Sequence, residues 1–227
     1  MYSIKNKTGQ GLLELIIAVG VISVGLFGVW GLFLSNYTAQ REAQARIIGA
    51  NLAREGAELV KNIRDSNWLL GAENMPCVYG GVSTAPDPCR WDSGLVGDGT
   101  ARIANPFSVA DARVANAGEV LELDFGVNAI SDESARLYQV DGFYSHQQTA
   151  SSTVYRRVIE TRALCCAVGA TDSLRCENAS YAMKELGQQC STPSELLIGV
   201  NVRSRVQWVF NGAERNLTIE DQLFNWK

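Results

Sequence analysis

A long apolar segment near the N-terminus constrains the fold of this chain more than any other feature. The run LIIAVGVISVGLFGVWGLFL begins directly after Glu14, which is the only charged residue from Gly11 to Leu34. As a helix, these residues, about 24 in number, would extend roughly 36 Å, which is enough to cross a hydrocarbon core of about 30 Å. Lys5 and Lys7 precede the segment. We therefore predict a membrane-spanning helix whose N-terminal side stays in the cytoplasm.

The position of Glu14 separates this segment from two simpler alternatives. A secretory signal peptide would have a shorter apolar core followed by a small-residue cleavage site, and residues 36–39 (NYTA) fit such a site poorly. A plain membrane anchor would tolerate Glu14 at the positive end of the helix dipole. It would not explain why Gly9 lies five residues earlier. A carboxylate costs a few kcal/mol inside a bilayer, so Glu14 is a candidate functional residue.

Gly9, Gln10 and Glu14, together with the basic head and the apolar run, resemble the N-terminus of the type IV pilin and pseudopilin superfamily, and most of all a minor pilin. In that family a short basic leader ends in glycine, and the fifth residue of the mature protein is a glutamate. The resemblance implies that a prepilin peptidase cleaves between Gly9 and Gln10 and methylates the new amine. Gln10 departs from the pattern, because phenylalanine or methionine is commoner there.

The resemblance also implies a role in assembly for Glu14. Cleavage creates an ammonium group at the membrane boundary, and a carboxylate one helical turn along a neighbouring subunit can neutralise it strongly in a low dielectric. The implied partners are other pilin subunits, the prepilin peptidase, an inner-membrane assembly platform and, before assembly, the lipid bilayer. The implied location is the inner membrane for the precursor, and a periplasmic or cell-surface filament after assembly.

We expect the chain to divide into a basic leader (1–9), a transmembrane and assembly helix (10–35), an amphipathic continuation of that helix (36–69) and a disulfide-bonded head (70–227). Ile48, Leu52, Leu59 and Ile63 recur at helical spacing and predict that the helix continues to about Asn67. The stretch from Asn51 to Leu69 also resembles the equivalent part of minor pilins. Residues 70–107 are rich in Gly, Pro, Asp and Ser, and predict a connecting loop.

The remainder of the chain predicts β-strands. Period-two alternation of apolar and polar residues is typical of strands with one buried face, and it favours strands near 121–125, 137–144, 154–161, 200–210 and 217–223. Asn211-Gly212 between the last two is a strong hairpin signal. We therefore predict an α+β fold in which a long N-terminal helix packs on an antiparallel sheet of four or five strands, as in pilins.

All six cysteines follow the apolar segment, and they are Cys77, Cys89, Cys165, Cys166, Cys176 and Cys190. An even number in an exported domain favours disulfides. Cys77 with Cys89 closes a natural local loop. Cys165 and Cys166 would point to opposite faces of a strand and bridge separately to Cys176 and Cys190, in an order that the sequence leaves open. Zinc is the weaker alternative, because paired C-x2-C ligands are missing and His146 is the only histidine.

The charge pattern gives little support for nucleic-acid binding. The formal net charge is −4, and removal of Lys5 and Lys7 with the leader makes it −6. A local basic strip would form if two strands that carry arginines are neighbours, and a solvated face neutralised by Glu160 and Glu220 is the alternative that we favour. The five arginines are Arg156, Arg157, Arg162, Arg203 and Arg205.

We find no pattern that indicates an enzyme, a cofactor or a metal site. His146 has no nucleophile motif around it, and the glycine pairs lie in expected loops instead of at strand-to-helix junctions. The leading hypothesis is a structural subunit, a minor pilin or pseudopilin, of a type IV pilus or a related secretion or uptake filament. The alternatives are an adhesive or DNA-capturing tip module on such a filament and a single-pass envelope protein that never polymerises.

Overall fold

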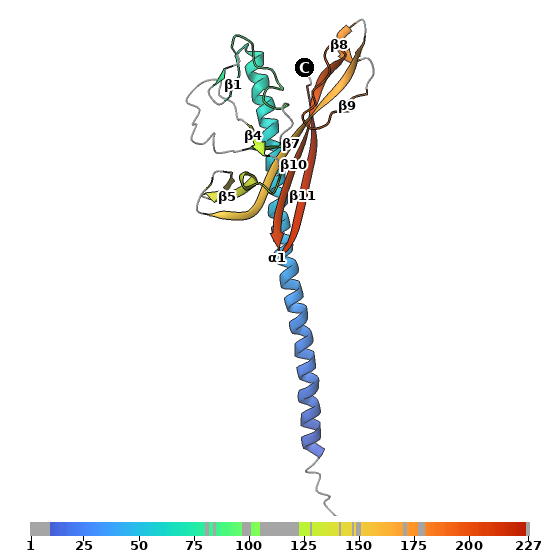
Figure 1. Ribbon diagram of the computed structural model, residues 1–227. Coiled ribbons are helices and arrows are strands. Elements are labelled where there is room, and N and C mark those ends of the chain that lie inside the picture. The colour runs from blue at the N-terminus through green and yellow to red at the C-terminus, as the bar shows by residue number, and fades with distance from the viewer. Residues whose placement is uncertain are drawn as a thin grey trace, which may run out of the picture. The chain divides into compact units, whose positions relative to one another are not determined.

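The computed structural model describes residues 10–79, 82–83, 85–96, 101–104, 123–127, 129–140, 142–146, 148, 151–169, 172–176 and 180–225 (Figure 1). The expected leader, including Gly9, lies outside these residues. One helix, α1 (Gln10–Ala72), is followed by strands and a short 3-10 helix, and this is the α+β class that the sequence predicts. The chain forms two compact units, one ending at Arg46 and the other beginning at Ile47.

The first unit consists of the N-terminal part of α1. Its large apolar side chains from Leu12 to Leu34 are all exposed, by between 49% (Leu34) and 78% (Phe27). A helix that is apolar on every side needs lipid or other helices around it. By length and composition, α1 is the one helix in the described chain that could cross a membrane.

The second unit contains the remainder of α1, where only one stripe is buried. Leu52, Ala53, Val60 and Ile63 are at most 2% exposed and recur at helical spacing. The helix ends five residues beyond the expected Asn67, at Ala72. Asn74 then adopts a left-handed conformation (φ 56°), while the Met75 N–H donates to the Leu70 carbonyl and the Asn74 N–H to the Gly71 carbonyl. This is a Schellman cap, and Pro76 follows it.

An antiparallel sheet lies against this part of the helix (Figure 1). Its main path runs in the order β11–β10–β7–β3–β4, from β11 (Ala213–Phe224) through β10 (Glu195–Phe210), β7 (Ser152–Gly169) and β3 (Ala101–Ala104) to β4 (Leu123–Val127). Asn211 and Gly212 (φ 50° and 75°) form the two-residue turn between β10 and β11, as predicted. Register is continuous from Gly199 opposite Phe224 to Phe210 opposite Ala213.

Shorter elements attach to this path and correct the expected strand limits. The expected strand at 137–144 is a hairpin of β5 (Arg136–Val140) and β6 (Phe143–Ser145), preceded by the 3-10 helix η1 (Glu133–Ala135). Gly142, with φ 88°, forms the turn that interrupts it. Strands β8 (Asp172–Cys176) and β9 (Ala182–Met183) pair with the end of β7. The stretch expected as a loop holds β1 (Val78–Tyr79) and β2 (Val82–Ser83), which pair with each other, and also β3.

The core of the head lies between α1 and the sheet. One cluster of buried residues joins the helix, a loop and the strands, and it comprises Val60, Ile63, Leu95, Ile159, Val200, Val202 and Leu223. From Val200 to Trp208 the even-numbered residues of β10 are buried on the side of the helix, as their alternation predicts. Small helix residues allow close contact: an added Cβ at Gly49 would lie 2.8 Å from the Trp208 ring, and one at Gly56 would overlap the Ser204 hydroxyl.

A buried amide fixes the loop over residues 85–96 to the helix. Asn67 is fully buried, and its Nδ2 donates to the carbonyl oxygens of Trp91 (3.3 Å) and Ser93 (2.8 Å). The hydroxyl of Thr161 on β7 donates to the Leu95 carbonyl. Because buried backbone carbonyls need hydrogen-bond donors, these bonds let an irregular segment enter the core.

We predict that Gly56→Ala lowers the free energy of unfolding of the head by about 1–2 kcal/mol, despite alanine's better helix propensity, because the new methyl group overlaps Ser204. Urea unfolding followed by near-ultraviolet circular dichroism measures the change. Gly28→Ala is the control, since no atom lies within 4 Å of a Cβ at Gly28. A Gly56→Ala protein as stable as the wild type would contradict the close approach.

Candidate assembly segment and the surfaces of the head

The two described residues of the expected processing and assembly motif begin α1. Gln10 is the first helical residue, and Glu14 lies four residues along, about 6 Å in helical rise. Glu14 is exposed on the helix surface, in a shallow depression that it shares with Leu13, Ile17 and Ala18. Its carboxylate is therefore placed one turn from the helix start and is open to a neighbouring molecule.

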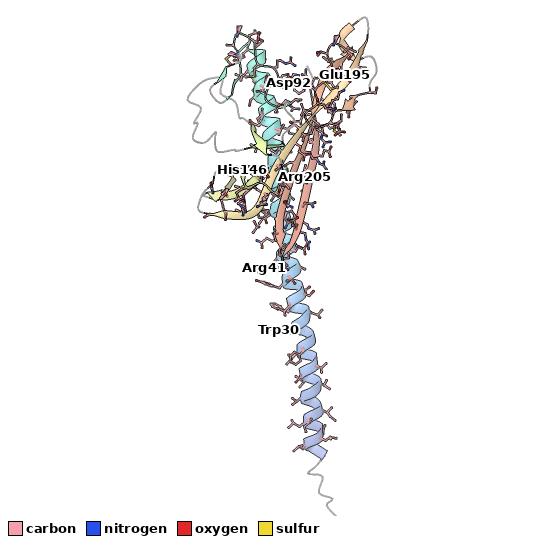
Figure 2. The ribbon with its side chains drawn as sticks, in the orientation of Figure 1. Trp30, Arg41, Asp92, His146, Glu195 and Arg205 are labelled. Carbon is pink, nitrogen blue, oxygen red and sulfur yellow. A yellow bond between two sulfur atoms is a disulfide. The ribbon has the colours of Figure 1, made fainter. Side chains whose placement is uncertain are left out.

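An aromatic row ends the apolar part of the helix. The ring centroids of Trp30 and Phe33 are 6.0 Å apart, those of Phe33 and Tyr37 are 6.5 Å apart, and the Arg41 guanidinium lies 5.2 Å from the Tyr37 ring (Figure 2). Trp, Tyr and Arg are the residues that favour a membrane–water interface. The i, i+3 and i+4 spacing of these residues is a signal in the sequence that indicates this boundary.

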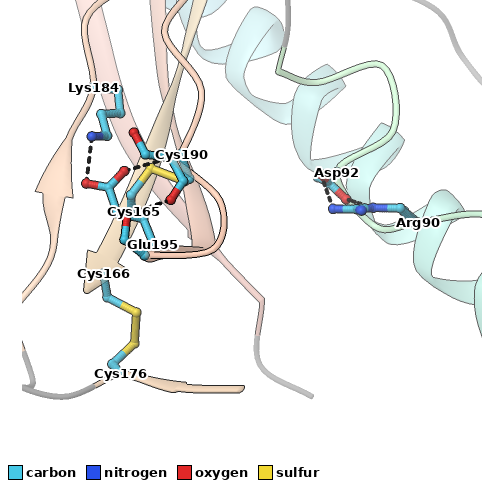
Figure 3. The surroundings of a disulfide bond; sticks show 10 residues. Arg90, Asp92, Cys165, Cys166, Cys176, Lys184, Cys190 and Glu195 are labelled. Carbon is cyan, nitrogen blue, oxygen red and sulfur yellow. Dashed lines mark hydrogen bonds and ion pairs between the residues drawn. A yellow bond between two sulfur atoms is a disulfide. The ribbon is translucent and has the colours of Figure 1, made fainter. Parts of the chain in front are cut away.

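Disulfides join all the cysteines of the chain. The pairs are Cys77–Cys89, Cys165–Cys190 and Cys166–Cys176. Figure 3 shows the last two of these pairs. Neighbouring Cys165 and Cys166 therefore bridge separately, and the pairing that the sequence left open is resolved. A sulfur atom in a disulfide does not serve as a thiolate ligand, so these pairs argue against the zinc alternative. Among the described residues, no cluster of three or more His, Cys, Asp or Glu side chains could hold a metal ion.

The local basic strip that the sequence suggested forms only in part. Strands β7 and β10 are neighbours, and Arg156, Arg162, Arg203 and Arg205 share the sheet face that points away from α1. Arg157 points to the opposite face and is fully buried, so its expected place in the strip was wrong. Glu160 lies among three of these arginines, at 3.2 Å from Arg205, 3.6 Å from Arg162 and 3.9 Å from Arg203.

Carboxylates accompany the arginines along this whole face. Arg136 is opposite Arg156, and Glu133 binds both of them. Glu214 and Glu220 also lie on this face, where they accept hydrogen bonds from Gln207 and Asn201. The charges are thus largely balanced, as on the mixed face that we favoured, and they give a nucleic acid little electrostatic attraction. The face is not fully solvated as expected, because Glu160 is buried.

Arg157 forms a buried link between β7 and α1. Its Nη1 donates to the Leu52 carbonyl and to Glu55 Oε1, each at 3.2 Å. Burial lowers the pKa of the Arg157 guanidinium, and the charge of Glu55 acts in the opposite direction. Sequence reasoning missed Glu55 as a partner, because the two residues are 102 positions apart and no local pattern connects them.

We predict that Glu55→Gln lowers the free energy of unfolding of the head by about 1–2 kcal/mol, because it leaves the buried Arg157 charge without its carboxylate. Glu58→Gln is the matched control. It removes only an exposed pair with Lys61 and should cost less than about 0.5 kcal/mol. Equal effects of the two substitutions in chemical denaturation would show that the Arg157–Glu55 pair does not stabilise the head.

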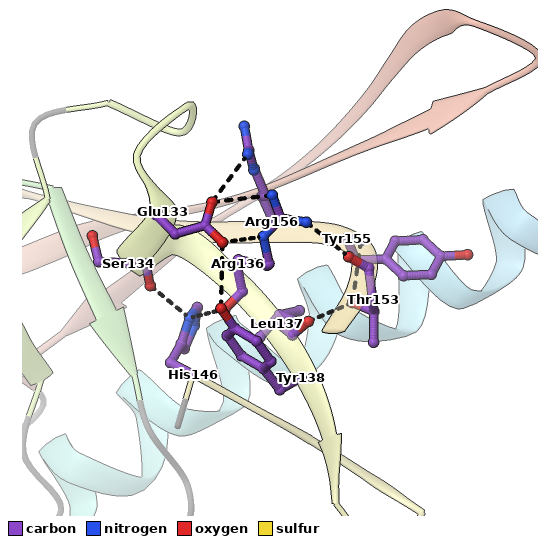
Figure 4. Close-up of polar contacts among 9 residues, drawn as sticks. All are labelled: Glu133, Ser134, Arg136, Leu137, Tyr138, His146, Thr153, Tyr155 and Arg156. Atoms are coloured by element: carbon purple, nitrogen blue, oxygen red, sulfur yellow. Dashed lines mark hydrogen bonds and ion pairs between the residues drawn. The ribbon is translucent and has the colours of Figure 1, made fainter. Parts of the chain in front are cut away.

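His146 is partly buried and lies against backbone carbonyl groups (Figure 4). Its Nδ1 lies 3.2 Å from the carbonyl oxygens of both Ser134 and Arg136, which places the proton on that nitrogen. Burial, and next the charge of Arg157, lower the pKa of His146 to about 3. The imidazole is therefore neutral at ordinary pH and orients η1 against β5.

We predict a pH dependence of stability that originates at His146. Its pKa is about 3 in the folded state and about 6.5 in the unfolded state, so protons bind the unfolded chain first. The contribution of His146 to the free energy of unfolding is therefore present above pH 6.5 and is lost as the pH falls. We expect a loss of about 1–2 kcal/mol between pH 7 and 5. His146→Asn should flatten this slope in urea titrations. An unchanged slope in that variant would contradict the assignment.

Comparisons of the chain with protein-family models, with curated proteins and with solved structures found no match.

Proposed function

We propose that the chain is a subunit of a pilin-like filament, most similar to a minor pilin or pseudopilin, that enters the inner membrane as a single-pass precursor. The observation that carries this proposal is the spacing of Gly9, Gln10 and Glu14 at the start of a long apolar helix, in a chain whose head is an antiparallel sheet packed on the same helix. No single one of these features would be sufficient.

The exposed apolar surface of α1 supports assembly. From Leu12 to Leu34 the large side chains are exposed, and no side chain in the described part of the chain covers them. Lipid can cover them before assembly, and equivalent helices of neighbouring subunits can cover them afterwards. Glu14 then acts as a register device, because its carboxylate can neutralise the new amine at Gln10 of a neighbour in a low dielectric.

The head supports an extracytoplasmic location and a structural role. Three disulfides are typical of exported domains. The balanced charges on the outer face of the sheet weaken the hypothesis of DNA capture, because salt-dependent binding needs an excess of cations. The remaining alternative, an envelope protein that never polymerises, differs from our proposal in one measurable property, the N-terminus of the mature protein.

Intact-mass analysis and N-terminal sequencing of protein from the native membrane test the processing step. We predict a chain that begins at Gln10, with or without a methyl group on its amine. A chain that begins at Met1 would refute the pilin-like proposal and leave an ordinary anchored protein.

We predict that Glu14→Gln leaves cleavage after Gly9 intact and reduces incorporation into sheared filaments at least tenfold, because the neighbour's amine loses its counter-charge. Glu42→Gln is the matched control. It removes a carboxylate from the same helix beyond the apolar segment, where Glu42 pairs with Arg46, and it should assemble normally. Normal assembly of Glu14→Gln would exclude the role assigned to Glu14.

A further inference from the structure

A cavity of about 440 Å³ lies in the head between two segments that disulfides hold in place. One wall is the segment from Arg90 to Val96, which directly follows the Cys77–Cys89 disulfide, and the other is the segment that Cys165–Cys190 joins to β7. Figure 3 shows residues from both walls, with Arg90 and Asp92 on one side and Cys190 and Glu195 on the other. This volume is typical of small-molecule sites.

The first wall presents an aromatic residue and an oriented carboxylate. Trp91 is half-buried and packs against the core, while its carbonyl is held by Asn67. Arg90 binds both oxygens of Asp92, through Nε at 3.1 Å and Nη2 at 3.0 Å. This bidentate pair fixes the plane of the carboxylate and leaves it with lone pairs for further donors.

The second wall presents a similarly oriented carboxylate and several neutral polar groups. Glu195 accepts from Lys184 Nζ at 2.8 Å and from the Ser191 N–H at 2.7 Å, and these bonds lower its pKa. Gln189 and Asn225 are exposed and add amide groups at the rim, and Thr192 adds a hydroxyl. An amide both donates and accepts hydrogen bonds, as the hydroxyl does.

The electrostatics of these walls select the class of ligand. Each carboxylate that lines the cavity has its own cation, Asp92 with Arg90 and Glu195 with Lys184. An ionic ligand would have to displace one of these pairs, whereas a neutral ligand leaves them in place. The partly exposed apolar residues Trp91, Val96 and Leu197 also line the cavity. The best match is a neutral molecule with an apolar C–H face and hydroxyl groups along its edge.

We propose that this cavity binds a neutral saccharide, one sugar face lying on Trp91 and its hydroxyls bonding to Asp92, Gln189 and Asn225. The rim amides and the paired carboxylates suit vicinal hydroxyls, which donate to one oxygen and accept from one N–H. The disulfides keep both walls in place before binding, which lowers the entropic cost of ordering them. This inference concerns the head alone and goes beyond the proposed role in filament assembly.

The test uses the full chain in phosphatidylcholine nanodiscs, because detergents with sugar headgroups would compete. The probes are the methyl glycosides of glucose, galactose, mannose and N-acetylglucosamine, each measured by saturation-transfer difference NMR and then by titration. We expect saturation transfer to at least one of them. We also expect Gln189→Ala and Asn225→Ala to weaken its affinity at least fivefold.

Gln188→Ala is the matched control, because Gln188 is an exposed neighbour of Gln189 that does not line the cavity. It should bind as the wild type does. An absence of saturation transfer from all four glycosides, or equal affinities of the Gln188→Ala and Gln189→Ala proteins, would overturn the proposal. Filament incorporation of Gln189→Ala is measured in parallel and should be normal, so a failure of the sugar site and a failure of the assembly role are distinguishable.

Discussion

The head depends on the close approach of one stripe of α1 to the sheet. This approach requires residues with little or no side chain at the points of crossing, and Gly49 and Gly56 meet Trp208 and Ser204 there. Around these points the larger residues Val60 and Ile63 fill the space between helix and strands. Burial of apolar surface contributes about 25 cal/mol per Å², so this interface stabilises the head. The glycines weaken the helix locally, and the packing that they permit offsets the cost.

The same interface also explains the buried polar groups. Arg157 is fully buried between the sheet and the helix, and Asn67 is fully buried between the helix and the loop, so each must find its partners within the protein. Arg157 uses Leu52 and Glu55 on the helix, and Asn67 uses the carbonyls of Trp91 and Ser93. Both side chains therefore connect segments that are distant in sequence. Their geometry fixes the helix to β7 and to the loop that forms one wall of the cavity.

Sequence periodicity predicted the parts of the fold that depend on local patterns. The alternation in β10 and β11 and the Asn211-Gly212 turn indicated the hairpin correctly, and the spacing of Leu52 and Ile63 indicated the buried stripe. Pairs of residues that are distant in sequence could not be predicted, because no pattern near Arg157 indicates Glu55 as its partner. The sheet face of Arg157 follows from the sequence, because adjacent residues of a strand such as Arg156 and Arg157 point to opposite faces. The prediction that placed both arginines in one strip was therefore wrong. The Schellman cap at Asn74 was also readable, because Pro76 follows it closely.

The two parts of α1 differ in which of their sides are apolar and in what covers those sides, and this difference separates their proposed roles. From Leu12 to Leu34 the helix is apolar on every side, so its stability comes from surroundings outside the chain. From Leu52 to Ile63 it is apolar on one side only, and the sheet of its own head covers that side. Glu14 takes part in none of the contacts that form the described core of the head, and effects at sites with no shared partners add independently. The head can thus acquire a binding cavity, and vary its loops, without disturbing the segment that we assign to assembly.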